Sequence, residues 1–451
     1  MIFKPETGHV TILGSEGLPQ LCNDLIRTDL SFSSVRQDLI NTTMRTSAPD
    51  DGIDARVEGA DDSYNGTWIP AKSSVWQYKS GKCPSANKLK KSEFCKIGVK
   101  RAIDDGESYC FVTSDDISAK KKTAIRNTIN KLYRKKNKEP AGRVYTAEDL
   151  AQWVSSHPTI GVRYFNLPAH GWLIIDQIEA VTRFRNKYFA DNQRRQLMEQ
   201  IHNSVEKGVK HLRILGLAGV GKTRMVIESL KIEKYRNRVL YLSDAANFTV
   251  DFSWYLRNKP SHVGLILIID ECTSENVQRI KDLVENLPSP TTSILIGPLE
   301  STLATGATKL EGLDQSNLSL ILESIAPEMP ESTREVIASR CGGSPKFAVD
   351  LCDQILRRIG EEFTWEEIEN NIDIVEYINA RIYFLNAEDN DAKLMRGLSL
   401  FTRIGWEKDV QYEGIAISEF FGLDWREARE AAISLIDRGI QSRRGRDFYP
   451  T

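Results

Sequence analysis

Eight consecutive residues near the middle of the chain have the types and spacing of a phosphate-binding loop. They read GLAGVGKT, follow the apolar run LRIL and precede a helix-like stretch. A strand, a glycine loop and a helix in this order place backbone N–H groups and a helix N-terminus around a phosphate. We expect Lys222 to contact the β- and γ-phosphates of ATP and Thr223 to ligate Mg²⁺. The loop residues expected to bind this nucleotide are Gly216, Gly219, Val220, Gly221, Lys222, Thr223 and Arg224.

Two acidic residues end a second apolar run, which extends from Leu265 to Ile269. The run predicts a buried strand, and such a strand delivers carboxylates to the C-terminal edge of a parallel sheet, beside the phosphates. Asp270 is then expected to hold Mg²⁺ through water, and Glu271 to orient or deprotonate the attacking water. Alternatively, Glu271 is a solvated acid at the end of a strand.

A third group of chemically capable residues lies near the N-terminus, where Asp54 is followed by Gln77 and Lys79 in the run VWQYKS. Residues two apart on a strand share a face, so Gln77 and Lys79 point one way and Trp76 and Tyr78 the other. The group resembles PD-(D/E)xK nucleases of the Mrr-like subset, in which Gln replaces the middle acid. That resemblance implies that Asp54 and Gln77 hold Mg²⁺ and that Lys79 orients the attacking water. Ordinary hairpin residues with a solvated lysine are the alternative. The candidate catalytic residues are Asp54, Gln77, Lys79 and Glu271.

The distribution of charge bears on the same region. The whole chain is nearly neutral, with 60 Lys and Arg against 62 Asp and Glu, which excludes a polycation that binds nucleic acid over its entire surface. Basic residues are nevertheless concentrated between Lys79 and Lys138, as on a surface that tracks a DNA duplex. Solvated helix faces are the alternative. Many PD-(D/E)xK nucleases also carry a Glu on their first helix, where this chain has Gln20.

Cysteine and apolar patterns indicate the compartment. The seven cysteines form no CxxC pair, as expected for reduced core thiols of a cytoplasmic protein. The longest apolar run, Val263 to Ile269, is too short to span a bilayer, and the N-terminus lacks a signal-peptide pattern. We therefore expect a soluble protein without a membrane partner.

The order of apolar runs and helical patterns predicts an α/β multidomain chain. Residues 1–165 alternate short β-like runs with Lys-rich helical segments, as a restriction-endonuclease-like α/β domain would. Residues 166–209 read as a helical connector. Residues 210–310 have the apolar runs of a parallel sheet covered by helices on both faces, the core of a P-loop NTPase.

Beyond residue 310 the pattern becomes helical. The segment CGGSPKFAVDL, which begins at Cys341, resembles the GxP motif in the lid of STAND signal-transduction ATPases. The resemblance implies a helical lid at 311–375 whose Pro345 contacts the adenine side of the nucleotide; a plain loop and helix start are the alternative. Residues 376–451 resemble an incomplete winged-helix domain, with two helices and a first hairpin strand.

Taken in this order, the domains resemble bacterial antiviral STAND proteins, often called Avs. The resemblance implies that a C-terminal sensor recognises a phage protein, after which ATP binding drives formation of a homo-oligomer, a tetramer, that cuts double-stranded DNA. No sensor repeats precede residue 451, so the chain is expected to be truncated. Two alternatives remain: a DNA-binding signalling or transcription-regulating STAND ATPase without nuclease activity, and a restriction-type nuclease driven by NTP.

Overall fold

The computed structural model describes most of the chain. The described residues are 3–31, 40–42, 51–58, 67–181, 187–217, 219–260, 262–298, 306–357, 364–366, 390, 394, 404–406, 411–420, 422–437, 441–444 and 447–450. They form two compact units. The first comprises residues 1–184, 194–215 and 223–308, and the second 185–193, 216–222 and 309–451.

The first unit begins with a mixed five-stranded sheet. Its strands, in spatial order, are β1 (Ile40–Thr42), β2 (Ala55–Val57), β3 (Ser74–Lys79), β4 (Ser108–Thr113) and β5 (Arg143–Tyr145). The first three pair antiparallel and the last three pair parallel. The parallel pairs require crossovers, which are supplied by α3 (Ala86–Ser92) and α4 (Ile97–Asp105), and then by α5 (Ala119–Lys135). The short β-like runs expected in residues 1–165 include β2, β3 and β4, which are strands of this one sheet.

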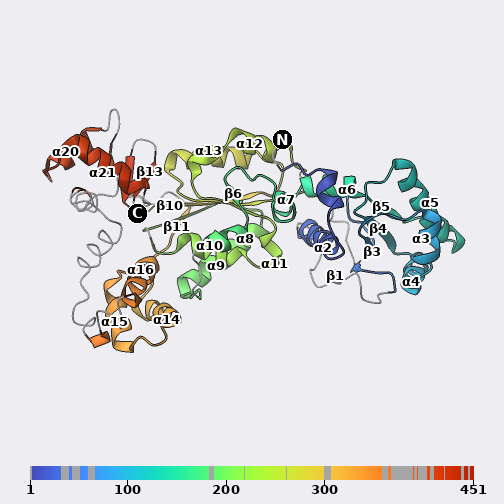
Figure 1. The fold of residues 1–451 in the computed structure, drawn as a ribbon, viewed down its shortest axis with the longest axis horizontal. Helices are drawn as coiled ribbons and strands as arrows, with labels where there is room; N and C mark the ends of the chain where they lie inside the picture. Colours follow the sequence, from blue (N-terminus) through green and yellow to red (C-terminus); the bar gives the residue numbers. More distant parts are fainter. Residues whose placement is uncertain are drawn as a thin grey trace. The chain divides into compact units, whose positions relative to one another are not determined.

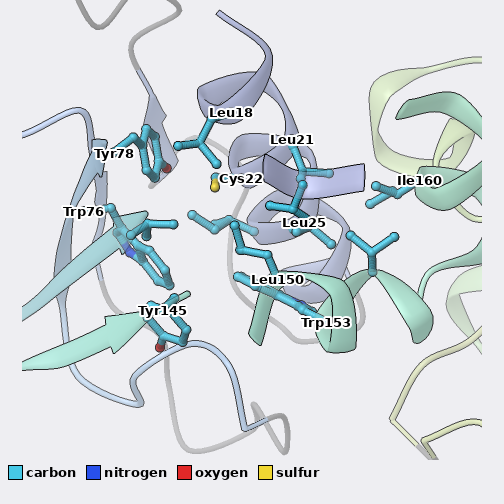
Figure 2. Packing of buried hydrophobic residues seen from close by; sticks show 14 of the residues in the cluster. Leu18, Leu21, Cys22, Leu25, Trp76, Tyr78, Tyr145, Leu150, Trp153 and Ile160 are labelled. Carbon is cyan, nitrogen blue, oxygen red and sulfur yellow. The ribbon is translucent and has the colours of Figure 1, made fainter. Parts of the chain in front are cut away.

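Each face of this sheet packs against different helices. On one face, Trp76 and Tyr78 meet α2 (Gly17–Leu30) and α6 (Ala147–Ser155), where Trp153 is fully buried (Figure 2). On the other face, Val75 packs with apolar residues of α3, α4 and α5. This alternation follows from the two-residue period of a strand. Helices α1 (Thr7–Thr11) and α7 (Pro158–Phe165) also contribute buried residues to the core that contains Trp76 and Tyr78.

A six-stranded sheet forms the rest of the first unit's core. Its spatial order is β11 (Ala307–Lys309), β7 (His211–Gly216), β10 (Thr292–Pro298), β9 (Ile266–Ile269), β8 (Val239–Leu242) and β6 (Trp172–Leu173). β8, β9 and β10 are parallel, and β6 pairs antiparallel with β8. β6 lies within the stretch assigned from sequence to a helical connector. It joins the sheet because the buried Trp172 stacks on Phe252, with ring centroids 4.1 Å apart.

Helices cover both faces of this sheet (Figure 1). One face carries α12 (Val250–Asn258) and α13 (Ser274–Glu285), and the other carries α8 (Ile175–Val181), α9 (Asn192–Glu206), α10 (Lys222–Leu230) and α11 (Glu233–Arg236). The 3₁₀ turn η2 (Ala245–Asn247) precedes α12. Burial on both faces explains why the central strands are apolar throughout, as in the fully buried run from Ile266 to Ile269.

The second unit contains two further clusters. Helices α14 (Gln315–Ile325), α15 (Glu331–Arg340) and α16 (Pro345–Leu356) share an apolar core. Near the end of the chain, α20 (Gln411–Phe420) and α21 (Trp425–Asp437) accompany a sheet of order β12 (Ile404–Gly405), β14 (Asp447–Pro450) and β13 (Gln441–Arg444). β13 and β14 pair antiparallel, so the expected first hairpin strand has a second strand beside it.

Ionic and hydrogen bonds connect the two sheets of the first unit. Arg163 on α7 binds Asp24 of α2 at 3.0 Å and Asp176 of α8 at 2.7 Å. Two histidines that match no motif in the sequence, His157 and His262, approach the fully buried carboxylate of Asp29 at 3.2 and 3.5 Å. Helices α2 and α7 therefore join the mixed sheet to the elements around the six-stranded one.

The buried Lys259 gives a testable consequence of this packing. Burial, with Lys210 and Arg238 nearby, lowers the pKa of Lys259 to about 7, although its Nζ donates a hydrogen bond to the Val263 carbonyl. The unfolded lysine titrates near about 10.4, so between these values the unfolded chain binds more protons and stability rises with pH. The buried, charged Lys259 therefore destabilises the folded protein most below pH 7.

We expect Lys259→Met to raise the apparent melting temperature most near pH 6 and little near pH 10, an effect of about 1 to 3 kcal/mol at the low end. Melting curves across this pH range measure it. Lys131→Met on the exposed face of α5 serves as the control. A melting-temperature difference that is independent of pH would contradict the assignment.

Candidate functional site

The loop expected to bind phosphate lies between β7, which ends at Gly216, and α10, which begins at Lys222. Gly219 and Gly221 have φ values of 78° and 90°, in the left-handed region that side chains with a Cβ disfavour. The Nζ of Lys222 donates to the carbonyls of Gly216 and Leu217, at 2.9 Å each. The ammonium group is thus held against the inner side of the loop that precedes its own helix.

The carboxylate that ends β9 is in direct contact with the first turn of α10. The hydroxyl of Thr223 donates to Oδ2 of Asp270 at 2.5 Å, and the Tyr241 hydroxyl lies 3.4 Å from the same oxygen. Burial and the negative charge of Asp270 raise the pKa of Tyr241, so this phenol stays protonated. The structure therefore brings together a hydroxyl and a carboxylate oxygen, the ligand types that Mg²⁺ prefers.

Glu271 has an unusual backbone conformation. Its φ is 53°, in the left-handed region that is uncommon for residues other than glycine, and its N–H donates to Oδ1 of Asp270 at 2.9 Å. Because of this turn directly after β9, the backbone at Glu271 departs from the direction of the strand. Backbone conformations of this kind concentrate at functional sites, where surrounding contacts sustain them.

The N-terminus of α16 lies against the loop. The backbone N–H of Lys346 donates to the Gly219 carbonyl at 3.3 Å, and Pro345 occupies the first turn of the helix. Ser344 caps this helix by accepting from the N–H of Phe347 at 3.2 Å. The predicted adenine-side residue Pro345 therefore belongs to a segment that contacts the glycine loop.

Two glycines make the turn before α16 possible. Gly342 and Gly343 have φ values of 56° and 80°. A Cβ on Gly343 would lie 2.9 Å from the Cα of Gly312, and the N–H of Leu313 donates to the Gly343 carbonyl at 2.9 Å. The pair of glycines in the CGGSP segment thus permits both the turn and a close approach of two backbones.

The second group of candidate residues lies where β2 and β3 pair. Asp54 comes just before β2, is 3% exposed and accepts the backbone N–H of Tyr78 at 2.6 Å. Gln77 on β3 is also buried, and its Oε1 accepts the hydroxyl of Tyr109. Trp76 and Tyr78 point to the opposite face, as expected. Gln20, which stands where many nucleases carry an acid, is exposed on α2.

Sequence reasoning missed an acid that contacts this group. Glu93, at the end of α3, accepts from Nε2 of Gln77 at 2.8 Å and from Nζ of Lys79 at 3.2 Å. Burial opposes ionisation of Glu93, but hydrogen bonds from Lys96 and Lys79 outweigh it, so the pKa of Glu93 lies below its usual range. The available signal was that Glu93 is the single acid in the sequence between Lys79 and Arg101.

The fit of a metal differs between the two sites. Within the described ranges, no cluster of three or more His, Cys, Asp or Glu side chains is arranged to hold a metal. Mg²⁺ is often bound by one or two carboxylates and otherwise by water and phosphate, so Asp270 with Thr223 fits such an ion. The fit is poorer around β3, because both amide atoms of Gln77 are already hydrogen-bonded within the protein. Asp54 and Glu93 are the carboxylates near this group.

An open pocket of about 320 Å³ lies beside the basic segment of the first unit. Lys122, Arg126 and Arg143 supply positive charge to its walls, and Trp68 and Tyr145 supply aromatic surface. Lys122 is paired with Asp149 at 2.6 Å, whereas Arg126 is exposed on α5. Part of the basic run is therefore committed to internal ion pairs.

The cysteines are all unpaired, and six are buried while Cys95 is exposed. Burial raises the pKa of buried thiols such as Cys272 and Cys341, to about 12, so they remain protonated.

In the described part of the chain, every helix is too short or too polar to cross a membrane.

Comparisons with known proteins concern the fold. No family model matches the chain, and no curated protein matches it at a significant level. Matching solved structures include RuvB, the Holliday junction branch migration motor of Thermotoga maritima (17% identity, TM-score 0.31, 58% of this chain and 92% of that chain). Others are Drosophila ORC bound to DNA (13%, 0.33, 61% and 87%) and a STAND protein with a tetratricopeptide repeat sensor from Pyrococcus horikoshii (16%, 0.30, 60% and 42%). At these scores the matches carry no information on the activity of this chain.

The contact between the glycine loop and α16 can be tested without any ligand. A Cβ on Gly219 would lie 2.5 Å from the Ser344 hydroxyl oxygen, in a backbone conformation already unfavourable for alanine. We expect Gly219→Ala to loosen this contact and to speed amide hydrogen exchange at Lys346 by about tenfold or more.

Gly208→Ala is a matched control for this experiment, because Gly208 has a φ of 67° but open space around its Cβ position. It should share the backbone strain without affecting α16. Equal exchange at Lys346 in the wild type and in Gly219→Ala would show that the contact does not hold the helix.

Proposed function

We propose that this chain is a STAND-type ATPase whose N-terminal domain is a Mg²⁺-dependent DNA endonuclease. The observation that carries the ATPase part is the contact of Thr223 with Asp270 beside a glycine loop that already holds Lys222. These groups are the ones that an Mg²⁺–ATP complex requires: a hydroxyl, a carboxylate and a cation directed into a loop of backbone N–H groups.

Each residue has a distinct role in the proposed hydrolysis. Thr223 and Asp270 hold Mg²⁺, which when bound offsets negative charge on the phosphates. Lys222 leaves the loop carbonyls to contact the β- and γ-phosphates. Glu271 accepts a proton from water as the water oxygen bonds to the γ-phosphorus, and the bond from that phosphorus to the bridging oxygen of ADP breaks. Pro345 contacts the adenine side, so the helices that follow respond to the nucleotide.

The nuclease part of the proposal is supported by the β2–β3 arrangement. Asp54 and Gln77 are the candidate metal ligands, and Lys79 is the candidate that orients water. A helix, three antiparallel strands, further helices and a strand parallel to β3 follow one another, as expected for a restriction-endonuclease-like domain. In the proposed reaction, the water oxygen bonds to phosphorus while the bond from phosphorus to the 3′ oxygen breaks, and that oxygen takes up a proton.

The biological setting we propose is defence against phage. Recognition of a phage protein by a sensor, followed by ATP binding, assembles a homo-oligomeric tetramer in the cytoplasm. One nuclease site cuts one strand, so cleavage of a DNA duplex requires two copies to be brought together. The oligomer is therefore the active form in this proposal.

A second candidate is a signalling or transcription-regulating ATPase whose N-terminal domain binds DNA without cutting it. The occupied amide of Gln77 favours it, because both of its polar atoms are already hydrogen-bonded. A restriction-type motor is less favoured, since the sequence SILIGPLESTLATG, which follows the acidic pair in the chain, contains no arginine that would serve as a finger.

Nucleotide binding and hydrolysis are separable at this site. Lys222→Ala should abolish ATP binding, because it removes the cation that meets the phosphates. Glu271→Gln should keep binding and slow turnover by roughly 10²-fold or more, the scale of losing a general base. Equilibrium binding of ATP and the rate of phosphate release measure the two effects, and tight ATP binding by Lys222→Ala would refute the assignment.

DNA cleavage should depend on the N-terminal site that contains Asp54, Gln77 and Lys79. Asp54→Ala or Lys79→Ala should each remove Mg²⁺-dependent degradation of plasmid DNA while ATP affinity stays unchanged. Because activity needs assembly, the untriggered chain should cut only at high protein concentration. Plasmid degradation is compared at matched concentrations of wild type and variants; undiminished cutting by both variants would remove the nuclease assignment.

A further inference from the structure

We infer that the exposed faces of helices α3 and α5 form one docking surface for the phosphate backbone of double-stranded DNA. The inference rests on the proposed action on DNA and names the surface that holds the duplex, which includes neither Asp54 nor Lys79. It depends on which face of the N-terminal sheet carries the cations, and on which cations have no partner inside the protein.

The two helix layers of this sheet differ in charge. α3 carries three Lys and α5 carries seven Lys or Arg, ten in all, and neither helix carries an acid. On the opposite face, α2 has two Asp and one Arg, and α6 has one Glu and one Asp without a cation. Because α3 packs beside α5, the ten cations belong to one layer of the domain.

Part of this charge is already used within the protein. Lys122 pairs with Asp149 at 2.6 Å, and Lys121 lies 4.0 Å from Asp115. Other cations of the two helices are exposed, and their side chains make no ion pair or hydrogen bond with any residue that the structure describes. They include Lys88, Lys90 and Lys91 on α3, and Lys131, Arg134 and Lys135 on α5.

The unpaired cations of α5 lie close to one another. Lys131 precedes Arg134 by three residues and Lys135 by four, so both are its neighbours on the helix surface. Like charges at these spacings repel and destabilise a helix. A bound polyanion removes this repulsion, because each phosphate compensates a charge that has no acid beside it.

The character of the surface favours a duplex over a membrane or a single strand. Neither helix exposes a large apolar side chain that would enter a bilayer. α3 has no aromatic residue and Tyr133 of α5 is buried, so these helices offer no ring on which an unpaired base would stack. Lys and Arg that meet only phosphates hold a DNA duplex without reading its sequence.

The experiment measures binding of a fluorescent DNA duplex to the full chain, without nucleotide and in EDTA, because binding requires neither assembly nor cutting. The α5 variant combines Lys131→Gln, Arg134→Gln and Lys135→Gln, and glutamine is a good helix former. Loss of three phosphate contacts should lower the affinity roughly 10- to 100-fold at about 0.1 M salt. It should also reduce the slope of log affinity against log salt by about 2 to 3, since fewer counterions are released.

A second variant tests the other helix independently. The α3 variant combines Lys88→Gln, Lys90→Gln and Lys91→Gln, which changes the net charge by the same amount. Its affinity and salt slope should fall in the same ranges as those of the α5 variant. Melting curves verify that each variant is folded before its binding is compared.

The control variant removes three cations that lie outside these helices. Lys4, Lys72 and Lys207 are exposed and form no ion pair within the described ranges; they stand before α1, before β3 and after α9. Changing all three to Gln alters the net charge equally. The control should bind the duplex within about threefold of wild type, with a salt slope changed by less than about 0.5.

Several results would overturn the inference: unchanged affinity and slope in either helix variant, equal losses in the control, or no duplex binding by wild type. Tighter binding of a single strand of the same length, or binding to anionic vesicles instead of DNA, would do the same. The nuclease proposal fails separately, when Asp54→Ala and Lys79→Ala both keep full plasmid cutting. In that case salt slopes that depend on α3 and α5 retain the docking surface in a protein that binds DNA.

Discussion

The hydrogen bond from the Thr223 hydroxyl to the Asp270 carboxylate ties the first turn of α10 to the end of β9. It exists because β7 and β9 belong to one sheet, with β10 between them, so the segments that follow the two strands emerge near one another. Together with the Tyr241 hydroxyl and the Glu271 N–H, the Thr223 hydroxyl satisfies a carboxylate that is held in a half-buried position. The turned backbone at Glu271 lies beside that contact, because its N–H donates to the other oxygen of the same carboxylate.

Close backbone approach is the second constraint. Gly219 meets the Ser344 and Lys346 segment, and Gly343 meets Gly312, so the start of α16 can lie against the glycine loop. Any larger residue at these glycines would separate the two segments. In the proposed ATPase, this backbone contact would make the start of α16 sensitive to what occupies the glycine loop.

The two faces of strand β3 in the N-terminal sheet carry side chains with different surroundings. Trp76 and Tyr78 contribute to the apolar core beneath α2 and α6, while Gln77 lies among polar partners on the other side. Charged groups persist there because Glu93 compensates Lys79 and Lys96, and because buried hydrogen bonds satisfy the amide of Gln77. Val75 on this same face packs on α3, α4 and α5, so polar and apolar residues share it.

The sequence by itself determined the strands with long apolar runs and the position of the glycine loop. Apolar runs predicted β2, β3, β4 and β7 to β10, because buried strands need continuous or alternating apolar side chains, and the glycine spacing located the loop at 216–223. Strand β6, the pairing of Asp29 with His157 and His262, and the contacts of Glu93 were decided by the tertiary structure alone. Each joins residues far apart in the chain, and a two-residue strand or a lone acid among lysines carries no periodic signal. Only packing, which closes these residues off from water, gives such groups their partners.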